Sequence, residues 1–116
     1  MMRTLLVILV CFLVACRSPN KIPDEIIGID KMKLIVWDMI QAGAFTENKF
    51  SRYPDTFRIK TLEMFQQVFV IHGITKDEFY KSYRYYEAHP DKNKILMDSV
   101  SAYATRHRMD LYKRLR

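Results

Sequence analysis

The residues with the clearest chemistry form the tetrad Leu13-Val14-Ala15-Cys16. The tetrad matches the bacterial lipobox, in which a leucine lies three residues before a cysteine and a small residue lies directly before it. The small Ala15 fits a narrow peptidase pocket, and the Cys16 thiol is the acceptor of a diacylglyceryl group. Cleavage between Ala15 and Cys16 makes Cys16 the new N-terminus, with an amine that is also open to acylation. We therefore expect Cys16 to carry lipid.

The segment before the tetrad has the pattern of a secretory signal. Arg3 supplies a short basic region, and Leu5 to Val14 is an uninterrupted run of ten apolar residues. Ten residues of helix rise only ~15 Å, about half of a ~30 Å hydrocarbon core, so this run is too short to span a membrane. The sequence predicts a signal peptide over residues 1–15. An ordinary secretory signal followed by an incidental cysteine is the alternative interpretation.

Residues 16–23 are expected to form the lipidated cysteine and a polar tether. The second cysteine, Cys11, lies in the discarded segment, so the mature chain would hold neither a free thiol nor a disulfide. The five residues after Cys16 reach at most ~17 Å, and two or three acyl chains anchor a protein durably where one does not. Neither an aspartate nor an acidic cluster follows Cys16. These absences favour the periplasmic leaflet of the outer membrane.

Elsewhere the residues capable of chemistry are scattered. The histidines His72, His89 and His107 form no i, i+4 pair around a carboxylate, so we expect them at the edge of the core, with no bound metal. Ser82 lies on the packed face of a predicted helix, where its hydroxyl would bond to the preceding turn. No mature cysteine remains to be activated as a nucleophile. We expect no enzyme activity, no cofactor and no small-molecule ligand.

Residues 69–75 read like the turn of a helix-turn-helix, and a helix rich in Tyr, Lys and Arg follows them. The position four residues before the turn glycine usually holds a small residue, so that the two helices can cross closely, and here it is Phe69. An exported, lipid-anchored chain also never meets the chromosome. We therefore expect no nucleic-acid partner.

These residues need a scaffold, and the sequence predicts an all-α one. The 116 residues are 49% hydrophobic and 28% charged, with a net charge of +6 and only 3 Gly and 4 Pro, and no segment alternates with a period of two. Helical spacing of the apolar residues predicts helices over 30–43, 55–72, 76–89 and 91–113. We expect a single domain over residues 24–116, a small bundle of about four helices after the cleaved signal peptide.

Local signals predict where these helices begin and end. Gly43 is expected to end the first helix, and Gly73 is expected to be a left-handed cap after the second. Thr75-Lys76-Asp77-Glu78 is a capping box that opens the third helix. Pro90 ends the third helix, because the residue before a proline disfavours helical dihedral angles.

The apolar pattern also predicts burial. The second helix is expected to be the most buried, since Ile59 and Val70 widen its apolar stripe, which consists of Leu62, Phe65, Val68 and Phe69. On the third helix, Tyr83 and Tyr86 are expected to face the core. The aromatic residues of the connector 44–54 are expected to fold back onto the core: Phe45, Phe50 and Tyr53.

The candidate partner surface consists of Leu34, Trp37, Tyr80 and Tyr85. Leu34 and Trp37 lie off the apolar stripe of the first helix, which indicates a second contact. Tyr80 and Tyr85 flank the packed face of the third helix, and tyrosine is enriched at interfaces. The alternatives are packing of Trp37 by the connector or the N-terminal arm, and an aromatic core with solvated hydroxyls. The basic end of the fourth helix is either solvated or in contact with anionic headgroups.

The chain resembles short Bacteroidota lipoproteins that share a helical domain of unknown function. In the first half, the resemblance is carried by Cys16, Ile22-Pro23 and residues 32–39. It is strongest in the second half, over His72-Gly73-Ile74-Thr75, Glu78-Phe79, Ser82, Tyr85-Tyr86 and Pro90. It implies a lipoprotein with an all-helical domain and supplies no activity. The later helices are also faintly similar to the helical N-terminal segment of periplasmic chaperone-isomerases, without the isomerase domain.

We therefore expect a lipid-anchored lipoprotein of the cell envelope, whose domain is a non-enzymatic, helical protein-binding module facing the periplasm. Its partners would be the membrane, through the N-terminal lipid, and another envelope protein. A chaperone-like holdase for envelope proteins is the alternative, and an enzyme or a helix-turn-helix DNA-binding protein is less favoured.

Overall fold

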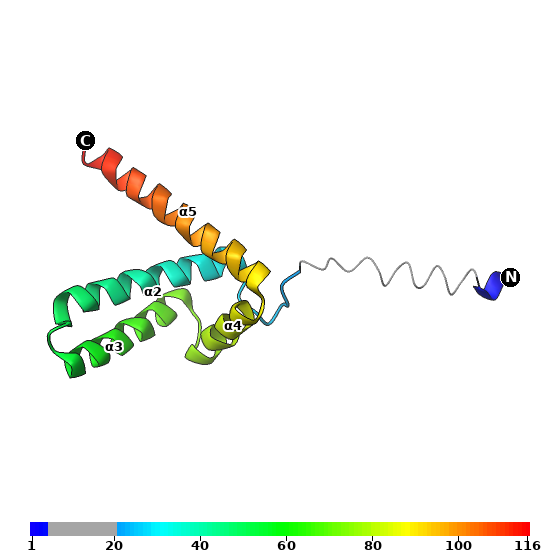
Figure 1. Cartoon of the computed structure of the whole chain (residues 1–116), viewed down its shortest axis with the longest axis horizontal. Helices are drawn as coiled ribbons and strands as arrows, with labels where there is room; N and C mark the ends of the chain where they lie inside the picture. Colours follow the sequence, from blue (N-terminus) through cyan, green and yellow to red (C-terminus); the bar gives the residue numbers. More distant parts are fainter. Residues whose placement is uncertain (5–20) are drawn as a thin grey trace.

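The computed structural model describes residues 1–4 and 21–116. Residues 21–116 contain four helices, α2 (Ile29–Phe50), α3 (Pro54–His72), α4 (Lys76–Ala88) and α5 (Pro90–Arg114) (Figure 1). The expected all-α bundle is confirmed. The expected lipid site at Cys16, the cleavage position after Ala15 and most of the signal peptide lie outside the described residues.

Local chemistry sets most of the helix ends, as the sequence predicts. Gly73 has φ 64°, and the amides of Gly73 and Ile74 donate to the carbonyls of Val70 and Phe69 at 3.1 and 3.0 Å, which is a Schellman motif. The capping box is formed as well, because Thr75 Oγ1 accepts from the Glu78 amide and the Glu78 carboxylate accepts from the Thr75 amide. Pro54 and Pro90 occupy the first turns of α3 and α5.

The expected end of the first helix at Gly43 is wrong, since α2 continues to Phe50. A glycine inside a helix costs only ~1 kcal/mol relative to alanine, and packing against α3 offsets that cost. Thr46 is fully buried and donates to the Ala42 carbonyl at 3.1 Å, while the hydroxyl of Thr61 on α3 lies 2.9 Å from the Thr46 hydroxyl.

The connector expected over 44–54 is therefore mostly helix, and its aromatic residues do not cover the core as expected. Phe45 and Tyr53 are 51% and 65% exposed, and Phe50 is half-buried. These residues belong to the last part of α2 and to the turn before α3, and this turn lies at one end of the molecule (Figure 1). Among the described elements, no other reaches this end to bury them.

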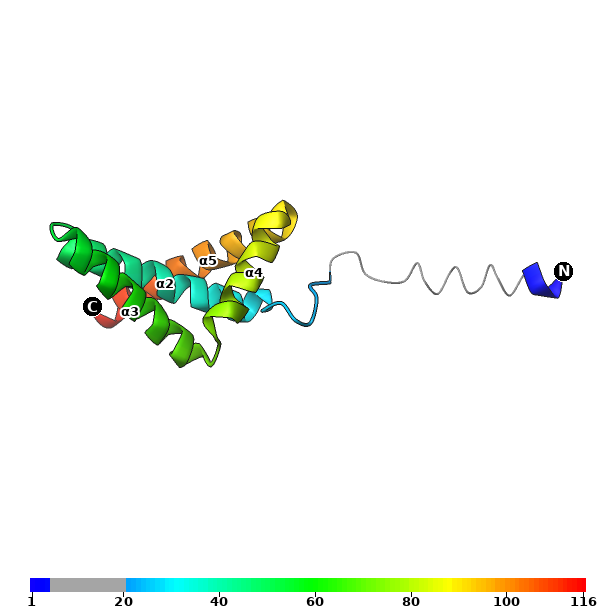
Figure 2. The same ribbon diagram turned by 90° about the horizontal axis from the view of Figure 1, so that it is seen from below.

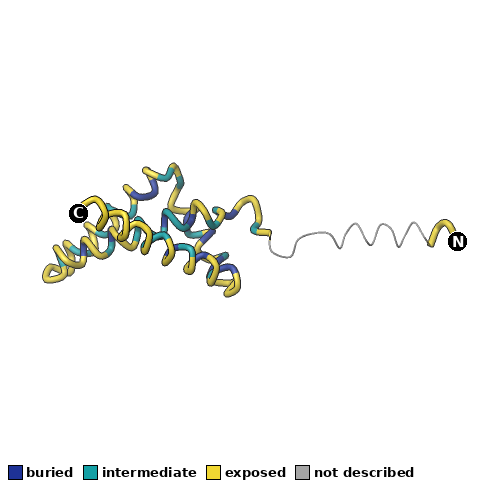
Figure 3. The backbone as a smooth tube through the Cα atoms, turned by 90° about the horizontal axis from the view of Figure 1, so that it is seen from above, coloured by how far each residue is buried: buried dark blue, intermediate teal, exposed yellow. Residues whose placement is uncertain are grey.

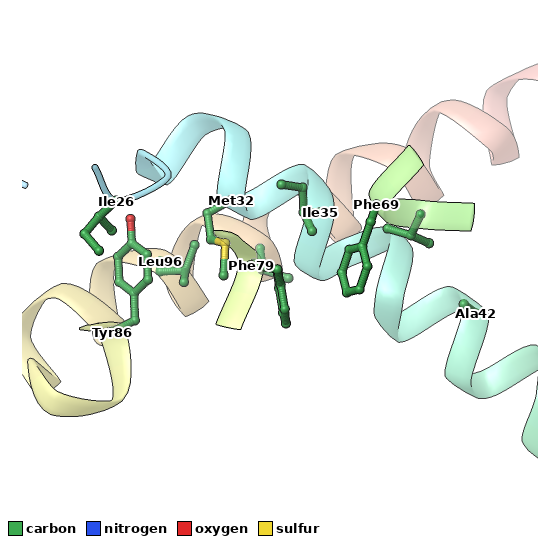
Figure 4. Close-up of a cluster of buried hydrophobic side chains, with 10 residues drawn as sticks. Ile26, Met32, Ile35, Ala42, Phe69, Phe79, Tyr86 and Leu96 are labelled. Atoms are coloured by element: carbon green, nitrogen blue, oxygen red, sulfur yellow. The ribbon is translucent and has the colours of Figure 1, made fainter. Parts of the chain in front are cut away.

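The four helices are arranged around α2. Helix α3 runs back along α2 as a hairpin, and α5 packs on another side of α2 and then diverges from it (Figures 1 and 2). Helix α4 packs on α3 and α5 and joins them. The core lies where the four helices and the arm before α2 meet (Figure 4), and it includes Ile26, Met32, Ile35, Phe69, Phe79, Tyr86 and Leu96.

The expectation that the second helix is the most buried is wrong. Of the α3 side chains, only Val68 and Phe69 are buried, whereas Ile59 and Val70 are 52% and 68% exposed. The reason is architectural: α3 has α2 along one side and α4 at its end, and no described element covers its outer face. Exposed positions extend along the free ends of the molecule (Figure 3). None of the described helices is both long and apolar enough to cross a membrane.

Candidate binding surfaces

The arm before α2 is held to α4 through the backbone of a single residue, Ile27. The Ile27 amide donates to Ser82 Oγ at 2.9 Å, and the Tyr86 hydroxyl donates to the Ile27 carbonyl at 2.7 Å. Ser82 and Tyr86 are four residues apart on the buried face of α4, so they reach the same strip of the arm. The structure thus gives Ser82 a partner far along the chain, in place of the expected bond to the preceding turn.

The same arrangement fixes the position of the arm relative to the core. Ile26 is buried beside the clamped residue, and Ile22 and Ile27 pack partly buried against the core. Tyr86 is 1% exposed, and this burial raises the pKa of its hydroxyl to about 12. We call Ile27, Ser82 and Tyr86 the arm clamp.

Trp37, expected to belong to a partner surface, is half-buried against α5. Its ring lies edge-on to Tyr103 and His107, with centroids 6.1 and 6.0 Å away. Leu34 is also half-buried. The structure therefore brings Trp37 together with α5, whereas the alternatives that the sequence left open were the connector and the arm.

A shallow hollow of about 250 Å³ lies where α2 and α5 begin to separate. Trp37, Ala104 and Leu111 are its apolar residues, and Gln41, His107 and Arg108 are its polar ones. Beyond this hollow, towards their C-terminal ends, the two helices diverge (Figure 1). Trp37 thus closes the inner end of an open wedge between α2 and α5.

The tyrosines of α4 make contacts of their own. Tyr80 lies edge-on to Phe79 at 5.3 Å, and Tyr85 stacks on His89 at 4.1 Å. Tyr83 is 45% exposed rather than packed as expected, whereas Tyr86 is buried as expected. Because α2 and α4 are joined through α3 and α5, the four predicted surface residues lie in two separate places, Leu34 and Trp37 on α2 and Tyr80 and Tyr85 on α4.

The outer face of α3 carries apolar residues that were expected in the core. Ile59, Leu62 and Val70 are 52%, 59% and 68% exposed, and at 100° per residue they lie on one side of the helix, opposite Thr61 and Val68. We call these three residues the α3 stripe. Charges beside it are balanced, since Lys60 pairs with Glu63 at 2.9 Å. The sequence contained a signal for this surface, because apolar residues occupy more sides of this helix than one core can bury.

The last part of α5 is a second surface that the described elements leave largely uncovered. Residues 105–116, here called the α5 tail, are all exposed. Leu111, at 48% exposure, borders the wedge, and Met109, Tyr112 and Leu115 are 54%, 65% and 86% exposed. The tail contains five basic residues and one acidic residue.

One protein family matches this chain. The model of DUF4296, a domain of unknown function, matches residues 23–108. The chain belongs to the DUF4296 family. The expected resemblance to a helical domain of unknown function is confirmed to that extent. Neither the comparison with curated proteins nor the comparison with solved structures returned a match.

The DUF4296 match includes the arm clamp, Trp37 with its contacts on α5, and the whole α3 stripe. It ends at Arg108, so the apolar residues of the α5 tail lie beyond it. The arm clamp, the contacts of Trp37 and the α3 stripe therefore belong to the DUF4296 domain, whereas most of the α5 tail follows it.

Two of the three histidines of the DUF4296 domain are hydrogen-bonded within the chain, and the third, His107, lies against the rings of Trp37 and Tyr103. His72 Nε2 lies 2.6 Å from Asp38 Oδ2 and joins α3 to α2, and His89 Nδ1 lies 2.7 Å from the Tyr85 carbonyl. Within residues 1–4 and 21–116, no three His, Cys, Asp or Glu side chains are grouped so that they could hold a metal ion. A hollow of about 570 Å³ between the arm and the α3–α4 turn has carboxylates and lysines on its wall, among them Glu25, Lys31 and Lys81.

Proposed function

We propose that this DUF4296 protein is a lipid-anchored lipoprotein of the bacterial cell envelope, of the Bacteroidota type, which faces the periplasm from the outer membrane. Its helical domain would be a non-enzymatic module that binds another envelope protein. The lipobox ending in Cys16 supports the anchor. The arm clamp would fix where such an anchor enters the domain, because Ile27 is bound to α4 only a few residues after the expected tether.

The α3 stripe carries the binding part of the proposal. Three aliphatic side chains on one side of a helix, each more than half exposed, leave apolar surface in water that a partner would cover. Their spacing suits the apolar face of a partner helix laid along α3. The neighbouring charges are paired with each other, Lys60 with Glu63, so a strongly charged partner is not favoured. We therefore assign the surface to an amphipathic helix of another envelope protein.

The anchor is tested by mass spectrometry of the mature N-terminal peptide. A cysteine at its start, with a mass increase that corresponds to two or three acyl chains, is the expected result. The Cys16→Ala variant should keep its leader and lose the lipid. An unmodified Cys16 in the processed wild-type chain would contradict the anchor.

The partner surface is tested by photo-crosslinking in intact cells. A crosslinker in place of Leu62, at the centre of the α3 stripe, should yield one defined product, and a crosslinker at the exposed Gln67, off the stripe, should not. The product should disappear when Ile59→Ser and Val70→Ser are added. Crosslinkers at Tyr80 and Tyr85 test the surface expected from the sequence. No product at Leu62 above background would overturn the assignment of the partner to α3.

A chaperone-like holdase is the second candidate, and one observation favours it. Exposed apolar residues occur on separate parts of the molecule: Phe45 and Tyr53 towards the α2–α3 turn, the α3 stripe, and the α5 tail. Such a distribution suits several weak contacts with an unfolded chain. A holdase should suppress aggregation of unfolded outer-membrane proteins, and the paired Ile59→Ser and Val70→Ser changes should weaken this only partly. Unchanged aggregation at an excess of the protein would exclude this candidate.

A further inference from the structure

We propose that the α5 tail docks on a phospholipid surface that carries anionic headgroups. This inference rests on the proposed anchor, which holds the domain near a bilayer, and it does not depend on a protein partner at the α3 stripe. His107, near the start of the tail, contacts Trp37 together with Tyr103, and beyond this contact α5 diverges from α2 (Figure 1).

The α5 tail is amphipathic, because its apolar residues lie on one side of the helix. At 100° per residue, Met109, Leu111, Tyr112 and Leu115 fall within an arc of about 160°. The centre of this arc lies about 120° from the side of α5 that buries Leu96 and Val100, although Leu111, at the edge of the arc, lies only about 20° from Val100. Met109, Tyr112 and Leu115 therefore form a face of their own. Leu111 instead lines the hollow beside Trp37.

Basic residues flank this apolar face. Arg106 and Lys113 lie along one border and Arg114 lies near the other, while the single acidic residue, Asp110, lies on the opposite side of the helix. Two further arginines, Arg108 and Arg116, lie within the apolar arc, and their side chains are long enough to direct the charged group outward. An apolar face bordered by cations is the pattern of a helix that lies in the interface of an anionic membrane.

Charge distinguishes the tail from the α3 stripe. Beside the stripe, Lys60 is neutralised by Glu63 at 2.9 Å, whereas the tail has five basic residues against one acidic residue. Each basic residue near an anionic bilayer strengthens binding about five-fold. The tail therefore matches a negatively charged surface, and the stripe matches a neutral one.

The position of the arm permits the contact. The arm clamp holds Ile27 next to Tyr86, and Tyr86 lies four residues before Pro90, where α5 begins. The expected tether before the arm reaches at most ~17 Å. From Pro90 to Leu111, α5 spans about 32 Å. If α5 lies parallel to the bilayer, the tether end and the tail can both meet the membrane.

The test uses the full, lipidated protein in vesicles, with an environment-sensitive dye on a single introduced cysteine. The proposed processing leaves no free thiol, so Leu115→Cys labels the apolar face alone, and Asp110→Cys labels the opposite side as a matched control. In vesicles that contain phosphatidylglycerol, the emission at position 115 should shift to shorter wavelength, and that at position 110 should not. The shift should be absent in pure phosphatidylcholine vesicles and lost at high salt.

A charge series completes the test. Arg106→Gln with Arg114→Gln should lower the ratio of docked to free tail about 25-fold, and the fold is kept because both side chains are exposed. Arg52→Gln with Arg58→Gln, in the α2–α3 hairpin, removes the same charge and should leave the emission shift at position 115 unchanged. No shift at position 115 in anionic vesicles overturns the proposal. A shift that instead follows protein density in the vesicles also overturns it and indicates a second copy as the partner.

Failure of the anchor gives a different result. In that case the protein does not stay with the vesicles, or the dye also labels Cys16, whatever the tail does. Retention on the vesicles without a spectral shift at position 115 therefore rejects the tail contact alone.

Discussion

At the scale of single residues, Ile27 is held through both of its backbone polar groups. Its amide and its carbonyl are both satisfied by side chains of α4, from Ser82 and Tyr86. A buried backbone group that loses its partner costs about 1–3 kcal/mol. The arm is thus positioned by hydrogen bonds with defined geometry as well as by the burial of Ile26.

Tyr86 gives the arm clamp a dependence on alkaline pH. Burial raises the pKa of Tyr86 from 10.0 in the unfolded chain to about 12 in the folded protein. The neutral hydroxyl is therefore favoured by folding, and its contribution is complete below pH 10 and is lost as the pH rises towards 12. We expect the free energy of unfolding of the wild type, measured with urea, to fall over that range relative to Tyr86→Phe.

Two comparisons control this measurement. At neutral pH, Tyr86→Phe should cost about 1–2 kcal/mol, because the Ile27 carbonyl loses its donor. Tyr112→Phe, at a site 65% exposed, should follow the wild type at every pH. Parallel curves for the wild type and Tyr86→Phe between pH 9 and pH 12 would show that the hydroxyl is not buried as described.

At the scale of elements, the helix ends set by neighbouring residues could be predicted from the sequence. Gly73, the capping box from Thr75 to Glu78, and Pro90 act within a few residues. Gly43 misled the prediction, because the contact that keeps α2 helical comes from Thr61, fifteen residues beyond Thr46. Helix propensity is a weak guide where a tertiary contact of this kind determines whether the helix continues.

The same distinction applies to the candidate surfaces. The off-stripe positions of Leu34 and Trp37 predicted a partner surface, which stays a prediction. Spacing along one helix could not identify Tyr103 and His107 as the contacts of Trp37 within the chain. The α3 stripe was assigned to the core because periodicity shows which side chains share a face. Whether another element covers that face depends on the whole arrangement of helices.

Substitution by alanine should have opposite effects on stability at Gly43, inside α2, and at Gly73, which caps α3. Gly43 lies inside α2, where an added Cβ would have no neighbour within 4 Å, so Gly43→Ala should raise the free energy of unfolding by about 0.5–1 kcal/mol. Gly73 has φ 64°, which is unfavourable for a residue with a Cβ, so Gly73→Ala should lower it by about 1 kcal/mol. Chemical denaturation followed by circular dichroism measures both. Equal effects of the two substitutions would contradict the assigned cap.

The packing of α5 on α2 depends on Trp37. Removal of its ring takes away the contacts with Tyr103 and His107, and Trp37→Ala should cost about 2 kcal/mol, less than a fully buried tryptophan would. Trp37→Phe, which keeps an aromatic ring, should cost less than half as much. Thermal unfolding measures both variants. A stability change below about 0.5 kcal/mol in Trp37→Ala, the range of an ordinary surface substitution, would show that α5 does not rest on this residue.

At the scale of the whole molecule, the α2–α3 hairpin and the C-terminal part of α5 diverge from each other (Figure 1). The buried residues lie where the helices meet, so stability should fall towards the free ends. Without a bilayer, amides from Met109 onward should exchange with solvent about 100-fold faster than those near Leu96 and Val100. Hydrogen exchange followed by mass spectrometry measures this gradient. Uniform protection along α5 would mean that the tail is covered in solution.

The arm clamp also determines how the molecule responds to force. If the proposed lipid anchor holds the N-terminus, tension would load the arm before it reaches the first turn of α2. Ile22 and Ile26 pack against the core in this arm, and the hydrogen bonds of Ile27 to Ser82 and Tyr86 follow. These two bonds can break while α2 and α3 remain paired. We therefore expect tension on the N-terminus to detach the arm from α4 first, while the α2–α3 hairpin stays intact.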